Sequence, residues 1–281
     1  MANNIELFKS CVPLLDEVYK EASLTGVLDG APELAQAGAS ADELIIPIME
    51  MSGLADYSRA NGYVQGDVTL RNETVRCNFD RGRMFSVDAL DDAETAGIAF
   101  GRLSGEFIRT RVVPELDAFR LSTYASFPGV FSRAAALNTG SDAVNALRVC
   151  VTRMDDHEVP IEGRILFILP ALRGLIEDLD TTKSRAVLSR FSQIISVPQT
   201  RMYTAIIQNA AGYQKAADAK DLQFLCVHPS AVIQFQKHLA PKVIPPDANP
   251  DADAWKFGYR SVGIASVYEN KTAGIYVHTA P

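Results

Sequence analysis

The feature that most constrains this sequence is a long amphipathic stretch from residue 88 to residue 121. Its large apolar residues recur at three- and four-residue spacing and fall close to one face of a helix: Phe100, Leu103, Phe107, Leu116 and Phe119. Aspartates crowd its beginning and arginines its end, as the helix dipole favours. At about 1.5 Å per residue, one helix of this length spans roughly 50 Å. The pattern predicts either the spine of a flat, tiling subunit or the core helix of a medium-sized enzyme.

Pro114 interrupts the pattern of this predicted helix. Proline has no backbone N–H, and its ring clashes with the carbonyl of the preceding turn. We therefore expect a kink or a break near Arg111.

The composition is that of a folded protein with no general affinity for nucleic acid. Of 281 residues, 47% are hydrophobic and 22% are charged. The net charge of −7 argues against a broad basic face, but it suits a container whose walls let DNA slide. The sequence has neither a signal peptide nor an apolar run long enough to span a bilayer, so we expect no membrane partner. The cysteines lie far apart and are predicted to be reduced and mostly buried: Cys11, Cys77, Cys150 and Cys226.

Alternating apolar and polar residues predict strands ahead of the spine. Residues 43–51 form a first strand, which Pro47 should place at a sheet edge. Residues 63–70 and 74–87 predict a hairpin that turns at 71–73. Because few of its residues face a core and two strands alone are marginal in water, we expect this hairpin to lie across a neighbouring subunit. Packing on its own domain is the alternative.

A short helix and an arm are predicted before residue 43, and a further helix is predicted after the spine. Residues 3–20 predict a short helix, and residues 21–42, which are rich in Ala, Gly and acidic residues, an extended or loosely ordered arm. After the spine, residues 131–154 predict a helix with Asp142 beside its cap.

A strand followed by a turn and a helix occurs twice in the second half of the chain. Residues 164–169 and 222–227 are short apolar runs, which are typical of buried strands. Helices are predicted after them, at 171–179 and 229–238. Together these elements predict a small α/β unit between about 134 and 245.

The prolines between 245 and 250 form the clearest break in the chain. Beyond them, residues 255–268 and 273–278 predict a second hairpin that turns at 269–272. Trp255 is interpreted as a core residue of this hairpin.

A search for catalytic and binding motifs finds no phosphate loop, no dinucleotide fingerprint, no nucleophile elbow and no zinc-protease helix. The run from Asp155 to Glu158 is dense in possible metal ligands, but a solvated loop explains it better. His228 follows a strand, and the proline after it favours a turn residue over a catalytic one. We therefore predict no catalytic residue, no cofactor and no metal. An α/β enzyme with its core in 134–245 stays open as an alternative.

Three stretches resemble one known family. FDRGRMFSVDALDDAET (79–95), GEFIRTRVVPELDAFRLSTYA (105–125) and DADAWKFGYRSVGIASVYENKTAGIYVHT (251–279) look like segments of tailed-phage major capsid proteins, from siphophages or prophages of Gram-positive hosts. The family has an α+β fold, the Hong-Kong-97-like fold. The resemblance implies these parts: an N-terminal arm (1–42), an E-loop with flanking strands (43–87), a P-domain spine helix (88–133), an α/β A-domain (134–248) and returning P-domain strands (249–281).

The resemblance implies a structural protein rather than an enzyme. Such subunits assemble as pentamers and hexamers into the icosahedral capsid of a virion, in the host cytoplasm, and enclose double-stranded DNA without reading its sequence. A portal is expected, and a separate scaffolding protein as well, because only about 40 residues precede the first strand. Residues 42–90 hold no lysine, which argues against the covalent crosslinking of some members. An encapsulin-like protein nanocompartment of the same fold is the nearest alternative.

Non-covalent contacts between subunits would then hold the shell together. The charged residues of the predicted hairpin are the candidates: Arg59, Arg71, Arg76, Asp80, Arg81 and Arg83. Arg81 and Arg83, which flank Gly82, are the preferred pair. Exposed ion pairs contribute only about 0–1 kcal/mol each, so their number or their burial on assembly must supply the strength.

Overall fold

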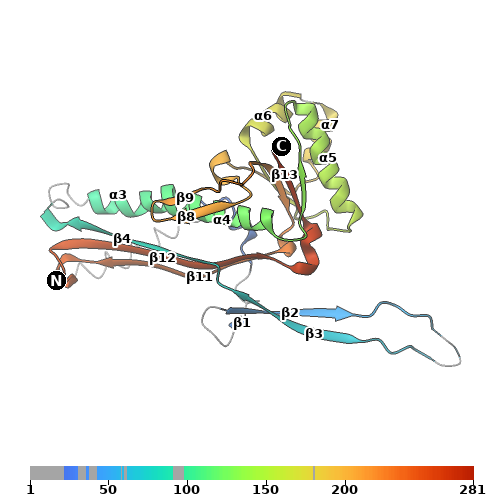
Figure 1. Cartoon of the computed structure of the whole chain (residues 1–281), viewed down its shortest axis with the longest axis horizontal. Helices are drawn as coiled ribbons and strands as arrows, with labels where there is room; N and C mark the ends of the chain where they lie inside the picture. Colours follow the sequence, from blue (N-terminus) through green and yellow to red (C-terminus); the bar gives the residue numbers. More distant parts are fainter. Residues whose placement is uncertain are drawn as a thin grey trace.

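The computed structural model describes residues 22–30, 36–37, 43–57, 59, 62–90, 98–179 and 181–281. The predicted helix at 3–20 and most of the predicted arm at 21–42 lie outside these residues. Figure 1 shows three parts: a long sheet with a helical spine along it, an α/β unit at one end of the spine, and a hairpin that projects from the sheet.

The spine consists of two helices joined by a wider turn. Helix α3 (Ile98–Phe107) continues through a π-helical segment (Ile108–Val112) into α4 (Val113–Ser126). Pro114 lies at the start of α4, where its missing N–H costs little. A kink or a break was predicted near Arg111; the structure has instead a π-helical segment that contains this residue, and the backbone stays helical from α3 into α4.

The spine joins two hydrophobic cores. Ile108, Val113 and Leu116 pack on Phe257 and Tyr259 of the long sheet. The last turns of α4 enter the core of the α/β unit through Leu121 and Tyr124, both of which are fully buried. One rigid element therefore fixes the position of the sheet relative to the unit.

The long sheet has three antiparallel strands in the order β11-β12-β4. They are β4 (Phe79–Asp88), β11 (Val232–Ile244) and β12 (Ala254–Val267). The helix predicted at 229–238 is wrong: a short 3-10 turn (Pro229–Ala231) leads straight into β11. Val232, Ile233 and Phe235 are residues that favour a strand, and the ladder from Val232–Val267 to Ile244–Lys256 holds the whole range in one.

The α/β unit contains a five-stranded sheet in the order β5-β13-β10-β6-β7. The predicted strands are confirmed as β6 (Ile165–Ile168) and β10 (Leu222–Val227). Beside them lie β7 (Gln193–Ser196), β13 (Ile275–Thr279) and β5 (Phe131–Ala134). The predicted second hairpin is wrong, because β12 and β13 belong to different sheets and β13 pairs with β10 and β5.

Three helices cover this sheet: α5 (Gly140–Asp156), α6 (Pro170–Leu179) and α7 (Thr182–Leu188). The helix predicted from 131 begins only at Gly140, where Thr139 and Asp142 form a reciprocal capping box. The prediction that residues 131–134 belong to this helix is wrong, because they form β5, which pairs with β13 from the far end of the chain.

The projecting hairpin consists of β2 (Glu43–Met51) and β3 (Val68–Arg76). The predicted turn at 71–73 is wrong: Asn72 pairs with Pro47 in the middle of the ladder. The ladder with β2 is unbroken from Glu43–Arg76 to Met51–Val68, and it holds residues 71–73 in an extended conformation. The connection lies instead between Met51 and Val68.

The prediction that Pro47 places its strand at a sheet edge is wrong for the strand as a whole, because β2 is the middle strand in the order β1-β2-β3. The short strand β1 (Gln36–Ala37) pairs only with Leu44 and Ile45 of β2. At Pro47, the side of β2 that faces away from β3 therefore has no partner strand among the described residues.

No helix in the described part of the chain is both long and apolar enough to cross a membrane. Cys150 and Cys226 are buried free thiols and Cys77 is a half-buried one, as predicted, while Cys11 lies outside the described residues.

Candidate assembly surfaces

The β2–β3 hairpin carries an apolar face that its own chain leaves in solvent. Met49 faces Leu70 and Met51 faces Val68 in the ladder, so all four side chains lie on one face. They are 57%, 63%, 71% and 65% exposed, in that order. Two strands without a covering layer are marginal in water, and a contiguous exposed apolar patch marks an interaction site.

The tip of the hairpin extends the same character. Leu54, Tyr57, Tyr63 and Val64 are all well exposed. The rings of Tyr57 and Tyr63 lie 4.9 Å apart and form a small aromatic cluster. We call residues 52–57 and 62–67 the hairpin tip.

Three of the six predicted contact residues lie on this hairpin. Arg59 lies between the two segments of the hairpin tip, Arg71 is in the middle of β3 and Arg76 is at its base, and all three are exposed. Arg59 and Arg71 make no ion pair with any residue that the structure describes. As contacts between subunits they stay predictions.

The other three predicted contact residues have partners within their own chain. Asp80 forms a bidentate ion pair with Arg260. Arg81 Nε donates to Glu115 of the spine at 2.8 Å, and Arg81 Nη2 donates to the carbonyl of Asn209 at 2.7 Å. As contacts between subunits these three residues also stay predictions; the ion pairs and hydrogen bonds described here lie within one chain.

The carbonyl that Arg81 binds belongs to a second small hairpin, β8 (Ile206–Asn209) and β9 (Gly212–Lys215). Arg83 Nη1 donates to the carbonyl of Ala210 in its turn. These hydrogen bonds hold the turn of the β8–β9 hairpin against the spine and β4. Sequence reasoning missed it, because 182–212 showed no clear pattern.

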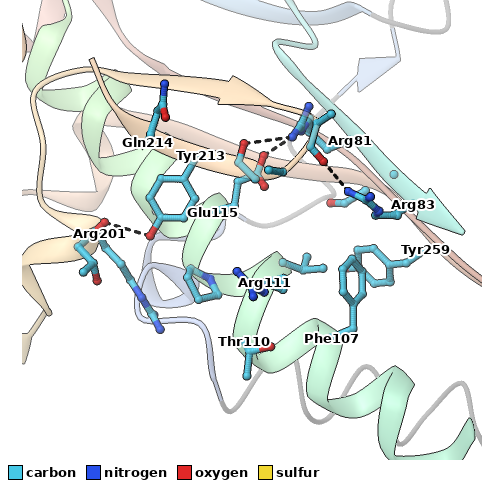
Figure 2. A pocket seen from close by; sticks show the side chains of 18 of the residues that line it. Arg81, Arg83, Phe107, Thr110, Arg111, Glu115, Arg201, Tyr213, Gln214 and Tyr259 are labelled. Atoms are coloured by element: carbon cyan, nitrogen blue, oxygen red, sulfur yellow. Dashed lines mark hydrogen bonds and ion pairs between the residues drawn. The ribbon is translucent and has the colours of Figure 1, made fainter. Parts of the chain in front are cut away.

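Between the β8–β9 hairpin, the spine and β4 lies a groove of about 1290 Å³ (Figure 2). Its walls combine aromatic rings with a surplus of positive charge, and they include Phe107, Tyr213 and Tyr259. Five cationic residues and two acidic residues line it: Arg81, Arg83, Arg111, Arg201, Lys215, Glu106 and Glu115.

Tyr213 and Arg111 both line the groove but differ in their contacts within the chain. Burial raises the pKa of the Tyr213 hydroxyl, which stays neutral and donates to the carbonyl of Thr200 at 3.0 Å. Arg111, by contrast, is exposed and forms no ion pair with the described residues. It is the groove cation best placed to bind a group from outside the chain.

A buried polar cluster fixes residues 22–30 to the spine. The carboxylate of Asp117 is fully buried and accepts hydrogen bonds from Ser23 Oγ, from the hydroxyl of Thr25 at 2.6 Å, and from the backbone N–H groups of Leu24 and Thr25. It also pairs with Arg201 Nη1 at 2.9 Å. This single carboxylate therefore joins three distant segments of the chain.

The neighbouring turn of α4 completes the cluster. Arg120 reaches Thr25 Oγ1 and Asp29, and Gln234 of β11 donates to the carbonyl of Thr25 at 2.7 Å. Tyr124 donates to the side-chain oxygen of Gln234 at 2.7 Å, and burial raises the pKa of its hydroxyl.

The run from Asp155 to Glu158 does not assemble a metal site. Asp155 instead pairs with the buried Arg164 at 2.7 Å and with Arg190 at 2.8 Å. No group of three histidine, cysteine or carboxylate ligands comes together among the residues that the structure describes. His228 is a turn residue, as predicted: it caps the 3-10 turn by accepting from the N–H of Ser230.

One histidine makes the stability of the fold depend on pH. His278 is buried in β13, stacks on Phe224 with centroids 4.9 Å apart, and lies 3.3 Å from the carbonyl of Ala135. Burial lowers the pKa of His278, and the nearby Arg133 adds to this effect. The folded protein therefore excludes a proton that the unfolded chain takes up as pH falls through about 6.5.

We expect the free energy of unfolding to fall as the pH drops below that range, since the unfolded state then binds more protons. The measurement is the urea midpoint at about pH 7.5 and about pH 5.5, for the wild type and for His278→Gln. The variant should have lower stability overall but a shallower pH dependence. An equal pH dependence in both proteins would contradict this assignment.

No protein-family model matches the sequence, and no curated protein is similar enough to count as a relative. Solved structures match along nearly the whole chain. A chain of Mycobacterium phage Che8 has a TM-score of 0.61 at 14% identity, covering 91% of this chain and 90% of that one. The virus-like particle from Pyrococcus furiosus has a TM-score of 0.64 at 11% identity, covering 97% and 99%. The capsid of cyanophage P-SCSP1u has a TM-score of 0.57 at 14% identity, covering 86% and 84%.

This chain has the Hong-Kong-97-like fold of phage capsid subunits. The predicted α+β fold class is thereby confirmed. The likeness concerns the arrangement of the backbone, since identities of 14% and 11% leave few side chains in common.

Proposed function

We propose that this chain is the structural subunit of an icosahedral shell that encloses double-stranded phage DNA. The observation that carries the proposal is the β2–β3 hairpin, whose apolar face and tip project from the body and are exposed, with no other described part of the chain covering them. A fold shared with phage capsid structures supplies the context in which such a hairpin finds its cover on another copy.

The parts of the subunit follow from this proposal, with boundaries that differ from the predicted ones at β4, β11 and β13. The E-loop comprises β2, the tip and β3, residues 43–76, because β4 belongs to the long sheet. The spine and the long sheet form the P-domain. The five-stranded sheet and its helices form the A-domain, which extends to β13 near the end of the chain.

The partners are in the first place further copies of this chain, arranged in closed rings by heterologous contacts. Double-stranded DNA is the proposed content, and the net charge of −7 fits walls that do not grip it. A scaffolding protein, a portal, location in the virion and assembly in the host cytoplasm belong to the same proposal. No catalytic role is proposed.

A protein-filled compartment is the second candidate, because the virus-like particle from Pyrococcus furiosus matches 97% of this chain. The two candidates differ in content rather than in fold. Nuclease-protected DNA inside the particles would favour the phage capsid, and a folded cargo protein would favour the compartment.

The experiment that tests the proposal is negative-stain electron microscopy of the purified protein, with light scattering on the same sample. We expect closed particles or rings of subunits. A compact monomer at all concentrations, with a small molecule bound in the groove, would favour the α/β enzyme instead.

A further inference from the structure

Three sulfur atoms meet in the core of the α/β unit, between α5 and the middle of its sheet. Cys150 and Met154 lie one turn apart on α5, and Cys226 lies in β10. All three side chains are buried, at 0%, 1% and 0% exposure. We propose that Cys150, Met154 and Cys226 form a binding site for one Cu(I) ion, a function separate from that of the shell.

The first argument is the closeness of the three sulfurs. Cys226 Sγ lies 3.4 Å from Met154 Sδ, and the Cys150 thiol forms a side-chain hydrogen bond with Cys226. Residues four apart on a helix lie on the same face, so both α5 ligands face β10. The sequence does not reveal this group, because Cys150 and Cys226 are far apart in the chain and meet only through the packing of the helix on the sheet.

The second argument is the kind of ligand. Thiolate and thioether sulfurs are soft ligands that select Cu(I), whereas Mg²⁺ and Ca²⁺ require oxygen ligands. A structural Zn²⁺ site takes four ligands, and these are cysteine, histidine or carboxylate side chains. Such side chains form no group of three in the described part of the chain, and the thioether of Met154 supplies the third ligand here. The site therefore fits a soft monovalent ion with few ligands.

The third argument is a buried positive charge beside the sulfurs. Binding of Cu(I) releases the two thiol protons to solvent and forms two copper–thiolate bonds and one copper–thioether bond, so the bound group carries one negative charge and no oxidant is needed. Arg164 is fully buried, and the charge of its guanidinium acts on the Cys150 sulfur. Its Nη2 pairs with Asp155, whereas its Nη1 has no hydrogen-bond partner among the described residues. A buried negative group requires such a counter-charge.

Anaerobic titration with Cu(I) tests the site, with a chromogenic Cu(I) chelator as the competitor. The starting protein carries Cys11→Ser and Cys77→Ser, so that Cys150 and Cys226 are its only thiols. We expect one Cu(I) per chain, a thiolate-to-copper charge-transfer absorption in the ultraviolet, and three sulfur neighbours of copper in X-ray absorption spectra. A titration of the same protein with Zn²⁺ should show no stoichiometric binding.

Met154→Leu in this starting protein is the decisive variant. It removes the thioether but keeps both thiols and nearly the same side-chain volume, so the fold is retained. We expect Cu(I) binding to weaken about tenfold, with two sulfur neighbours of copper instead of three. The matched control is Met202→Leu, which changes another fully buried methionine in a different core cluster. It should bind Cu(I) as tightly as the starting protein, and circular dichroism checks the fold of both variants.

The titration is repeated after the full chain has been refolded from urea in the presence of Cu(I), so that burial of the sulfurs cannot prevent access. If the chelator then still retains all of the copper, the site is overturned, and Cys150 and Cys226 are core residues only. Equal Cu(I) affinity of Met154→Leu and the starting protein would overturn the coordination by three sulfurs. Neither result bears on the assembly of a shell.

Discussion

Replacing Asp117 with alanine is expected to lower the free energy of unfolding by about 3–5 kcal/mol, a large part of the total stability of a typical domain. The substitution leaves the guanidinium of Arg201 without its ion-pair partner and the N–H groups of Leu24 and Thr25 without an acceptor. Unpaired groups of this kind cost their full desolvation penalty. The measurement is the urea midpoint of the purified subunit at fixed pH, with the slope of the transition checked for two-state behaviour.

A milder variant keeps this prediction measurable if the alanine variant does not fold. Asp117→Asn retains the shape and one acceptor oxygen but loses the charge, so we expect an intermediate loss of stability. Hydrogen exchange should show faster exchange of the amides of residues 22–30 than of the α/β unit, because the cluster holds that segment. The control is Glu177→Gln, which removes an exposed pair with Arg173 and should cost less than about 0.5 kcal/mol. Equal losses for Asp117→Asn and Glu177→Gln would refute the role of the cluster.

Replacing Leu70 with aspartate is expected to abolish shell assembly while leaving the subunit folded. Leu70 is 63% exposed in the single chain, so the new charge does not disturb the core of the subunit. In a shell the apolar face of the hairpin becomes buried, and the loss of about 2 kcal/mol at each contact raises the concentration for assembly about thirtyfold. A buried charge adds to that cost. The measurement is light scattering during assembly, with electron microscopy of the product and circular dichroism of the subunit.

The matched control lies one residue away. Thr69 is also exposed, and its side chain points to the opposite face of β3, because neighbours in a strand alternate. Thr69→Asp should therefore assemble close to normally. If Leu70→Asp forms shells as readily as Thr69→Asp, the apolar face does not carry the contact.

The elements that sequence reasoning predicted correctly depend on signals within a few residues of one another. Pro114 predicted an irregularity in the spine, which is the π-helical segment just ahead of it, because the effect of proline on the helix ladder is local. The apolar runs at β6 and β10 predicted two buried strands in the same way. Asp142 was expected beside a helix cap, and it forms a capping box with Thr139 three residues away, although the helix was predicted to begin at 131.

The errors occurred where a partner from a distant part of the chain decided the conformation. In residues 232–244, Ile233 and Phe235 alternate with Gln234 and Gln236, but only the full ladder with β12 makes the whole range one strand. Residues 131–134 form a strand only because β13 arrives beside them. Residues 71–73 were taken for a turn because the true partner of β3, the strand at 43–51, precedes it rather than follows it.

The candidate surfaces also differ in whether the sequence could predict them. The exposed arginines of the hairpin could be named from the sequence, and so could the idea that this hairpin needs cover. The groove could not, because its walls come from the spine, β4 and the β8–β9 hairpin, which are far apart in the chain. Arg81 and Arg83 were identified as important, but the carbonyls of Asn209 and Ala210 that they bind within the subunit were not foreseen.

The order of residues alone settled that this chain folds into a mixed structure with an interrupted spine, a small α/β unit and an extended arginine-bearing arm. Periodicity and capping act over one or two turns, so they can be recognised without coordinates. Tertiary structure alone decided which strands share a sheet, where the arm bends back, and that a buried Asp117 joins the beginning of the described chain to the spine. Those choices depend on contacts between residues far apart in the chain, and no local pattern encodes which distant partner a segment meets.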